Sequence, residues 1–186
     1  GSGVIRFEPG GPKRFTSNEG LPNDSVFALA AHPGGGVWAG TAGGGLARIV
    51  DGRVTTDGCP RLPTGQVSAL LVDRDDGLWV GTWGRGLCRV KDRDVECRSA
   101  ATGDPAADHV WSLFQDREGN VWVGTWTEGL LRLRHGVVAS FGRREGLLGE
   151  NVRAVAEDAS GAIWATVASG GLHRIRGGEV RAYGTK

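Results

Sequence analysis

A tryptophan-centred motif constrains this chain more than any other feature, because the sequence contains four copies of it. The full motif spans Leu78–Thr82, and close copies lie at Val37–Thr41 and Val121–Thr125. A fourth copy, Ile163–Thr166, lacks the glycine of the others. The four tryptophans are spaced 41, 43 and 42 residues apart. A fixed period of this size is typical of an array of similar supersecondary units.

Further positions recur when the four units are aligned on their tryptophans. A valine lies twelve residues before each tryptophan, a glycine seven residues after it and an arginine ten residues after it. No unit has an insertion between its valine and its arginine, so the length varies only in the connections. Three units also have an aspartate six residues before the tryptophan. The recurring residues are Val26, Val67, Val110 and Val152; Gly45, Gly86, Gly129 and Gly171; Arg48, Arg89, Arg132 and Arg174; and Asp73, Asp116 and Asp158.

Each unit has the pattern of four short strands. The first strand starts at the valine, as in Val67–Val72, and the second carries the tryptophan. A glycine-containing loop leads to a third strand such as Gly86–Val90, and the fourth is weaker, as in Val95–Cys97. Short apolar runs with β-branched residues, bounded by glycine and aspartate, favour strands over helices. No window has helical periodicity, so we predict an all-β fold.

Four antiparallel strands in about 42 residues form the blade of a β-propeller. We predict a single propeller segment over residues 1–186, with four full blades and a half blade at the N-terminus. Because each blade has two apolar faces, neighbouring blades must stack, and we expect the motif tryptophans to pack between them. We expect the recurring arginines to lie across a blade edge and to bond carbonyls or a turn carboxylate. The predicted half blade covers residues 3–16, and the blades cover about 20–57, 61–98, 104–141 and 146–183.

One known repeat shares the sequence pattern of Gly20–Val26, Val37–Thr41 and Gly44–Arg48. From about Gly20 to Tyr183 the chain resembles the two-component regulator propeller repeat. In that family such propellers form extracytoplasmic sensor regions, which precede a membrane helix and a histidine kinase or diguanylate cyclase output. The resemblance therefore implies a periplasmic sensor segment of a bacterial signalling receptor. In sensors of this family the ligands are often oligosaccharides.

The two predicted ends of the chain do not complement each other. Gly3–Phe7 matches the third strand of a blade, such as Gly171–Ile175, and Lys13–Thr16 would be the fourth strand. The chain thus opens with half a blade and closes with a complete one. Because unpaired blade faces and strand edges favour association, we expect self-association through them, for instance two chains forming one ring. A compact four- or five-bladed monomer is the alternative.

The composition argues against two kinds of partner. The net charge is +1 and no basic run or stripe is present, so we do not expect nucleic-acid binding. No segment has the length and apolarity of a membrane span, so we expect no membrane insertion in this segment.

The sequence contains three cysteines, and two of them are predicted to form a cross-strand pair. If the hairpin turns at Lys91–Asp94, Cys88 faces Cys97. Such a pair can be bridged only if its Cβ atoms lie closer than those of most facing pairs. The alternative is that these two cysteines and Cys59 are free, partly buried thiols.

The candidate functional residues lie in loops where the repeats differ, because repeat scaffolds usually carry function there. Loops that enter the first strand and loops that follow the second strand share one end of a propeller. In two units the residue after the motif threonine is an additional tryptophan, suited to stacking on sugar rings or other planar ligands. Packing between blades or within the inner strand layer is the alternative role for these tryptophans. The predicted ligand-binding residues are Trp83, Trp126, Trp111, Arg85, Glu128, Gln66, His109, Asn151 and Arg153.

No combination of residues in the sequence predicts catalysis, and we expect no metal and no cofactor. The four histidines occupy four different repeat positions and have no metal-ligand spacing. We therefore predict a non-enzymatic ligand-sensing or interaction propeller. One alternative is an enzyme similar to the antibiotic-opening propeller lyases, with His109 and Glu128 as the only suitable pair. A second alternative is a purely structural propeller-assembly segment without a ligand.

Overall fold

The computed structural model describes residues 1–43, 45–59, 62, 65–92, 94–99, 108–134 and 136–184. Within them the strands form one two-stranded sheet and four four-stranded sheets. The small sheet pairs β1 (Val4–Glu8) with β2 (Gly11–Phe15). The large sheets are β3 (Val26–Ala31), β4 (Val37–Thr41), β5 (Gly45–Val50), β6 (Arg53–Thr55); β7 (Gln66–Val72), β8 (Leu78–Trp83), β9 (Leu87–Lys91), β10 (Asp94–Arg98); β11 (Val110–Gln115), β12 (Val121–Thr125), β13 (Leu130–Arg134), β14 (Val137–Phe141); and β15 (Val152–Glu157), β16 (Ile163–Val167), β17 (Gly171–Arg176), β18 (Glu179–Tyr183).

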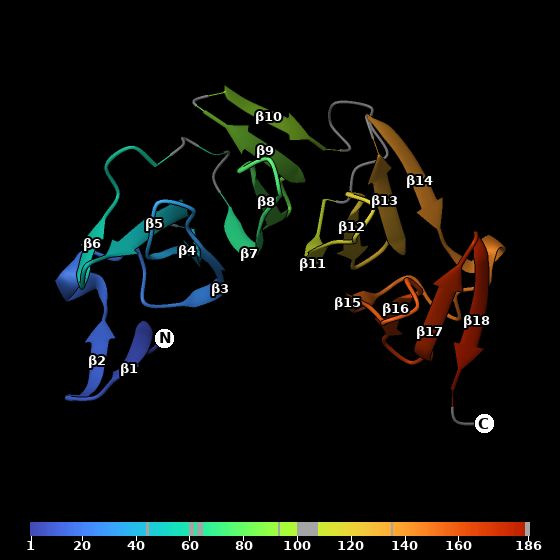
Figure 1. The fold of residues 1–186 in the computed structure, drawn as a ribbon, viewed down its shortest axis with the longest axis horizontal. Helices are drawn as coiled ribbons and strands as arrows, with labels where there is room; N and C mark the ends of the chain where they lie inside the picture. The colour runs from blue at the N-terminus through green and yellow to red at the C-terminus, as the bar shows by residue number, and fades with distance from the viewer. Residues whose placement is uncertain are drawn as a thin grey trace.

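Each large sheet is an antiparallel meander in which the strands pair in chain order. We number these sheets as blades one to four along the chain. The five sheets follow one another along an open arc, with β3, β7, β11 and β15 inside and the fourth strand of each blade outside (Figure 1). This arrangement confirms the predicted fold class: an all-β propeller of four full blades and an N-terminal half blade.

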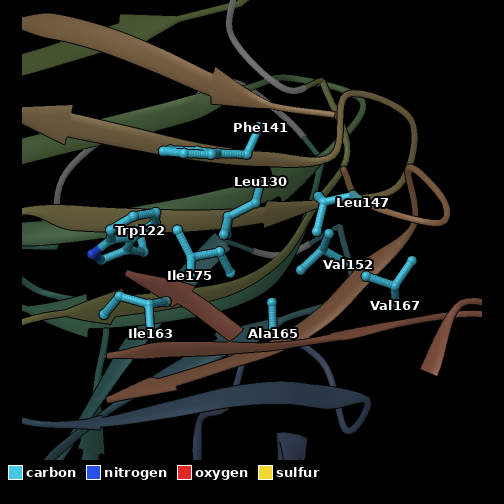
Figure 2. Close-up of a cluster of buried hydrophobic side chains, with 9 residues drawn as sticks. All are labelled: Trp122, Leu130, Phe141, Leu147, Val152, Ile163, Ala165, Val167 and Ile175. Carbon is cyan, nitrogen blue, oxygen red and sulfur yellow. The ribbon is translucent and has the colours of Figure 1, made fainter. Parts of the chain in front are cut away.

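The core lies between the blades, where the tryptophan-bearing face of one blade packs against the next blade. In the contact between blades one and two, Trp38 and Leu46 pack with Val67, Val80 and Val90. The contact between blades three and four repeats this pattern, as Figure 2 shows with nine buried side chains. These are Trp122, Leu130, Phe141, Leu147, Val152, Ile163, Ala165, Val167 and Ile175. The motif tryptophans are therefore packing elements of the fold.

The motif glycine allows the blades to approach closely. A Cβ atom on Gly81 would lie 2.4 Å from Cγ1 of Val110, the first-strand valine of blade three. A Cβ atom on Gly40 would lie 2.4 Å from Cγ1 of Val67. In blade four the same position is Thr166, whose side chain is exposed because the described chain places no further blade against it.

A turn carboxylate fixes the motif tryptophan in blades two, three and four. In blade two, Trp79 Nε1 donates a hydrogen bond of 2.8 Å to Asp73 Oδ2, and Arg89 Nη2 lies 2.7 Å from the same oxygen. Burial acts to raise the pKa of Asp73, but hydrogen bonds from Arg89, Gly77 and Trp79 outweigh it, so the pKa lies below its usual value. These hydrogen bonds, one of them from a charged guanidinium, thus keep this carboxylate ionised.

The predicted arginine role is confirmed in two blades. Besides Arg89, the guanidinium of Arg174 lies 3.8 Å from Asp158, within ion-pair distance. In all four blades the arginine also lies over the ring of its tryptophan, 5.3 to 6.0 Å from the centroid. The arginine therefore covers the indole in every blade.

The structure bridges Cys88 and Cys97 with a disulfide, and these residues face each other across β9 and β10. The predicted cross-strand pair is thus present in its bridged form, with a Cα–Cα distance of 4.0 Å. Cys59 is free and half-buried. No helix in the described residues has the length and apolarity needed to cross a membrane.

Candidate ligand-binding site

A β-bulge follows the valine at the start of the first strand in every blade. The pairing register shifts between Val110 and Ser112 in β11, and the other three first strands shift at the same repeat position. A bulge leaves its extra residue unpaired and changes the direction of its side chain. The four residues placed in this way are Phe27, Ser68, Trp111 and Arg153. Two of them belong to the predicted ligand-binding set.

The structure brings the predicted aromatic residues into one cluster at the junction of blades two and three. The ring centroid of Trp83, at the end of β8, lies 4.7 Å from His109, 5.0 Å from Trp111 and 5.4 Å from Trp126. The rings of Trp111 and Trp126 are 5.8 Å apart. Trp83 meets each neighbour edge to face, which is a favoured geometry for aromatic pairs. We call these four residues the aromatic cluster.

A cation from blade four completes the group. The guanidinium of Arg153, on the bulge of β15, lies 5.5 Å from the ring centroid of Trp111. A guanidinium at this distance from an indole is attracted by the negative face of the ring. Three consecutive blades therefore contribute side chains to one end of the propeller.

The members of the aromatic cluster differ in their exposure. Trp126 has 40% of its surface exposed, whereas Trp83, Trp111 and His109 are half-buried. The packing role considered for Trp83 thus applies in part, because its ring is surrounded by three others. Trp126 presents the face that a ligand can reach.

Two buried polar atoms of the predicted set have no hydrogen-bond partner among the described residues. They are the indole Nε1 of Trp111 and the side-chain oxygen Oδ1 of Asn151. One is a donor and the other is an acceptor. An unpaired buried polar group costs about 1–3 kcal/mol, so a ligand or a water molecule that pairs with these atoms would be favoured.

The remaining predicted residues lie next to Trp83 or Trp126 in the strand pairing or in the sequence. Gln66 is half-buried and pairs with Trp83 across β7 and β8. Arg85 is exposed in the loop after β8. Glu128 is exposed, and its carboxylate accepts a hydrogen bond of 2.6 Å from the hydroxyl of Thr127.

The pair considered for catalysis, His109 and Glu128, is not arranged as a catalytic pair. His109 forms an isolated bridge with Trp83, and its carbonyl accepts a hydrogen bond of 3.0 Å from the Trp126 amide. The described residues record no contact between His109 and Glu128, and they contain no group of three residues suited to hold a metal. This arrangement is suited to binding a ligand by stacking and hydrogen bonds.

The predicted ligand-binding set did not include Ser68. Its hydroxyl lies 2.5 Å from the carbonyl of Val110 and 3.2 Å from that of Gly81, and it joins blades two and three. The signal was available in the repeat alignment, since Ser68 occupies the same bulge position as Trp111 and Arg153.

The fold and the repeats define a class: a β-propeller segment built from repeated four-stranded blades. Two parts of the chain, residues 61–84 and 105–127, match the model of the two-component regulator propeller family. These segments contain two of the motif tryptophans and all three tryptophans of the aromatic cluster. The resemblance inferred from the repeat is thereby confirmed: the chain carries two-component regulator propeller repeats. No curated protein matches the sequence.

Solved structures with the same fold include an extracellular domain of a bacterial protein and an enzyme. The extracellular domain of a B. thetaiotaomicron protein described as a one-component system is 18% identical, with a TM-score of 0.70. The match covers 96% of this chain and 30% of that chain. Catalytically inactive virginiamycin B lyase from Staphylococcus aureus, solved with quinupristin, is 20% identical, with a TM-score of 0.78. That match covers 98% of this chain and 62% of the lyase. At these identities the similarity establishes the fold alone.

Proposed function

We propose that this chain is a non-enzymatic, ligand-sensing propeller segment of a bacterial signalling receptor, and that the aromatic cluster binds the ligand. One observation carries the proposal: three tryptophans and a histidine from different parts of the repeat meet at one end of the molecule. These tryptophans are additional to the four that pack the blades. The match to the two-component regulator propeller family supports a sensory role.

An oligosaccharide is the proposed ligand class. Trp126 exposes an indole on which the apolar face of a sugar ring can stack. Arg153 and Glu128 are exposed charged neighbours, and they can bond the hydroxyl groups of a sugar and fix its orientation.

We place the segment outside the cytoplasm. Disulfides form and persist in oxidising compartments such as the bacterial periplasm, and Cys88 and Cys97 are bridged here. The B. thetaiotaomicron structure with the same fold is described as an extracellular domain.

A glycan panel tests the ligand proposal with two matched variants. Trp126→Ala removes the exposed indole of the aromatic cluster, and we expect binding of the best oligosaccharide to weaken by about tenfold or more. Val137→Ala removes an exposed apolar side chain on β14, 69% exposed, outside both the aromatic cluster and the proposed association faces, and should leave binding unchanged. A correctly folded Trp126→Ala variant that binds the panel like the parent protein would refute sugar stacking.

An enzyme is the second candidate, because the solved structures with this fold include a lyase. His109 and Glu128 would have to act with a divalent metal ion. Under the sensing proposal, EDTA and added divalent cations leave both ligand binding and thermal stability unchanged. A metal-dependent loss of ligand would favour the enzyme.

We also propose that the segment self-associates through its two terminal blade faces. Phe7 on β1 is 84% exposed, and Ile5 beside it is 42% exposed. At the other end Leu172 and Tyr183 of blade four are also exposed. Apolar side chains on uncovered sheet faces favour association.

Light scattering at micromolar concentration should give more than one chain mass, and a strict monomer would refute association. Association without binding of any glycan would instead favour a purely structural assembly segment.

A further inference from the structure

Blade one differs from the other blades at the turn that fixes the tryptophan. In the other three blades an aspartate accepts a hydrogen bond from the tryptophan Nε1. Blade one has His32 at this position, six residues before Trp38. The rings of these two residues are 5.1 Å apart. Blade one therefore lacks the carboxylate that the repeat places beside its tryptophan.

The imidazole of His32 reproduces only half of what the aspartate does. Its Nδ1 accepts a hydrogen bond of 2.9 Å from the Gly34 amide, just as Asp158 Oδ1 accepts one of 2.8 Å from the Ser160 amide. Burial, with a contribution from the nearby Arg48, lowers the pKa of His32, so the ring is neutral at neutral pH. With Nδ1 as an acceptor, the proton of the neutral ring is on Nε2, which is a donor.

Arg48 is left without the partner that its equivalents in blades two and four have. Its guanidinium lies 5.6 Å from the centroid of the Trp38 ring, but its Nε is buried and has no hydrogen-bond partner among the described residues. In blades two and four the same arginine pairs with the turn aspartate. Burial raises the pKa of the neighbouring Cys59 thiol, which therefore stays protonated and supplies no negative charge.

These residues lie around a pocket of about 500 Å³ between blades one and two. His32, Trp38 and Cys59 line it from blade one, and Val72, Leu78 and Val90 form its apolar wall on blade two. The exposed Asp76 and Asp92 also line the pocket. The pocket thus has the ring N–H groups of His32 and Trp38 beside an apolar wall, and the guanidinium of Arg48 lies behind this lining, 5.6 Å from the centroid of the Trp38 ring.

We propose that this pocket binds a small organic carboxylate, whose carboxylate group takes the place of the missing aspartate beside Arg48, Trp38 and His32. A carboxylate is the group that the other blades hold at this position, and the planar guanidinium matches its geometry. The apolar body of the ligand packs against Val72, Leu78 and Val90. The nearby Asp76 and Asp92 disfavour a more highly charged anion such as sulfate.

This site is separate from the aromatic cluster and does not depend on the function proposed for it. The turn that carries His32 joins the end of β3 to the start of β4, whereas the aromatic cluster lies at the opposite ends of the corresponding strands in blades two and three. The two sites can therefore be tested in one protein by different tryptophan signals.

Benzoate is the probe, with benzamide as its uncharged counterpart and sulfate as the inorganic anion. In ¹⁵N-labelled protein at neutral pH, benzoate should shift the indole N–H signal of Trp38 and leave those of Trp83 and Trp126 in place. Benzamide and sulfate should bind at least about tenfold more weakly, because a charged hydrogen bond or an apolar contact is lost.

Two variants test the assigned residues. Arg48→Gln should weaken benzoate binding by about tenfold or more. His32→Asp restores the carboxylate of the repeat, so it should abolish benzoate binding and raise the melting temperature by about 2–4 °C. Arg176→Gln, an exposed arginine on blade four, is the matched control and should bind like the parent. Three results would each overturn the proposal: no shift at tens of millimolar benzoate, equal binding of benzamide or sulfate, or unchanged binding by both Arg48→Gln and His32→Asp.

Discussion

At the scale of single residues, one buried carboxylate organises the first turn of a blade. Asp116, only 4% exposed, accepts hydrogen bonds from the Trp122 indole at 2.7 Å, the Asn120 amide at 2.8 Å and the Asn120 side chain at 2.7 Å. The aspartate thus fixes both the turn and the tryptophan that packs against blade four. The repeat shows the position of this aspartate in the sequence, but its hydrogen bond to the tryptophan was found only in the structure.

Asp116→Ala should destabilise the protein by about 3 kcal/mol, because three donors lose their acceptor in a buried site. Asp158→Ala, at the same position of blade four, should cost less, since Asp158 is more exposed and water can replace it. Urea denaturation monitored by tryptophan fluorescence measures both losses. Equal losses for the two variants would show that burial does not determine the cost.

The buried histidine of blade four gives a prediction about pH. His173 is fully buried, and its Nε2 accepts a hydrogen bond of 3.0 Å from the Leu148 amide. Burial lowers the pKa of His173 below its usual value of 6.5, so the unfolded chain binds the proton more readily than the folded chain. The stability linked to this histidine is therefore complete above pH 6.5 and is lost as the pH falls below it.

Urea denaturation between pH 8 and pH 5 tests the direction of this pH dependence. The free energy of unfolding should fall as the pH is lowered through about 6.5. His173→Gln keeps an acceptor for the Leu148 amide but cannot be protonated, so its stability should depend less on pH. The pH dependence that remains in His173→Gln is expected to come from His32, whose pKa is also lowered. An unchanged pH dependence in His173→Gln would contradict this assignment.

At the scale of blades, the motif glycine sets how closely two blades approach. Gly81→Ala should cost about 1–3 kcal/mol, because the added methyl group would overlap Val110 of the next blade. Thr166→Ala is the matched control at the same repeat position in blade four, where the side chain is exposed. Its stability in thermal denaturation should stay within about 0.5 kcal/mol of the parent. A neutral Gly81→Ala would mean that the blades separate easily.

The disulfide stabilises the outer hairpin of blade two. It links β9 and β10 across nine positions of sequence, and closing a loop of this size is worth about 2–3 kcal/mol. Reduction with dithiothreitol should lower the free energy of unfolding by this amount. Cys59→Ala should keep the full response, whereas Cys88→Ala/Cys97→Ala should not respond. A parent protein whose stability is insensitive to the reductant would contradict the stabilising role.

The elements of the fold were more predictable than the arrangement of the candidate site. The period of the tryptophan motif places four strands in each unit, and the facing of Cys88 and Cys97 follows from the hairpin register. The sequence placed Trp83, Trp111 and Trp126 at the same end of the propeller, but it did not predict their contacts with one another. Their edge-to-face contacts depend on the bulge in β11, which changes the direction of one side chain without leaving a sequence signal in a single unit. The unpaired Nε of Arg48 likewise depends on three-dimensional contacts.

At the scale of the whole molecule, seven tryptophans divide into two groups. Four recur, one in each blade, and lie beside the recurring arginines; those of blades one to three also pack against the next blade. Three occur only in the second and third units and meet at the junction of blades two and three. The first group holds the propeller together, and we propose that the second group binds the ligand. The two groups are Trp38, Trp79, Trp122 and Trp164, and Trp83, Trp111 and Trp126.

The indole N–H signals of these tryptophans test this division most directly. A ¹⁵N-labelled sample is titrated with the best-binding oligosaccharide of the panel, and the seven indole signals are followed together. We predict shifts for Trp83, Trp111 and Trp126 and unchanged signals for the four motif tryptophans. Shifts confined to the motif tryptophans, or binding that moves none of the three signals of the aromatic cluster, would contradict the proposed function.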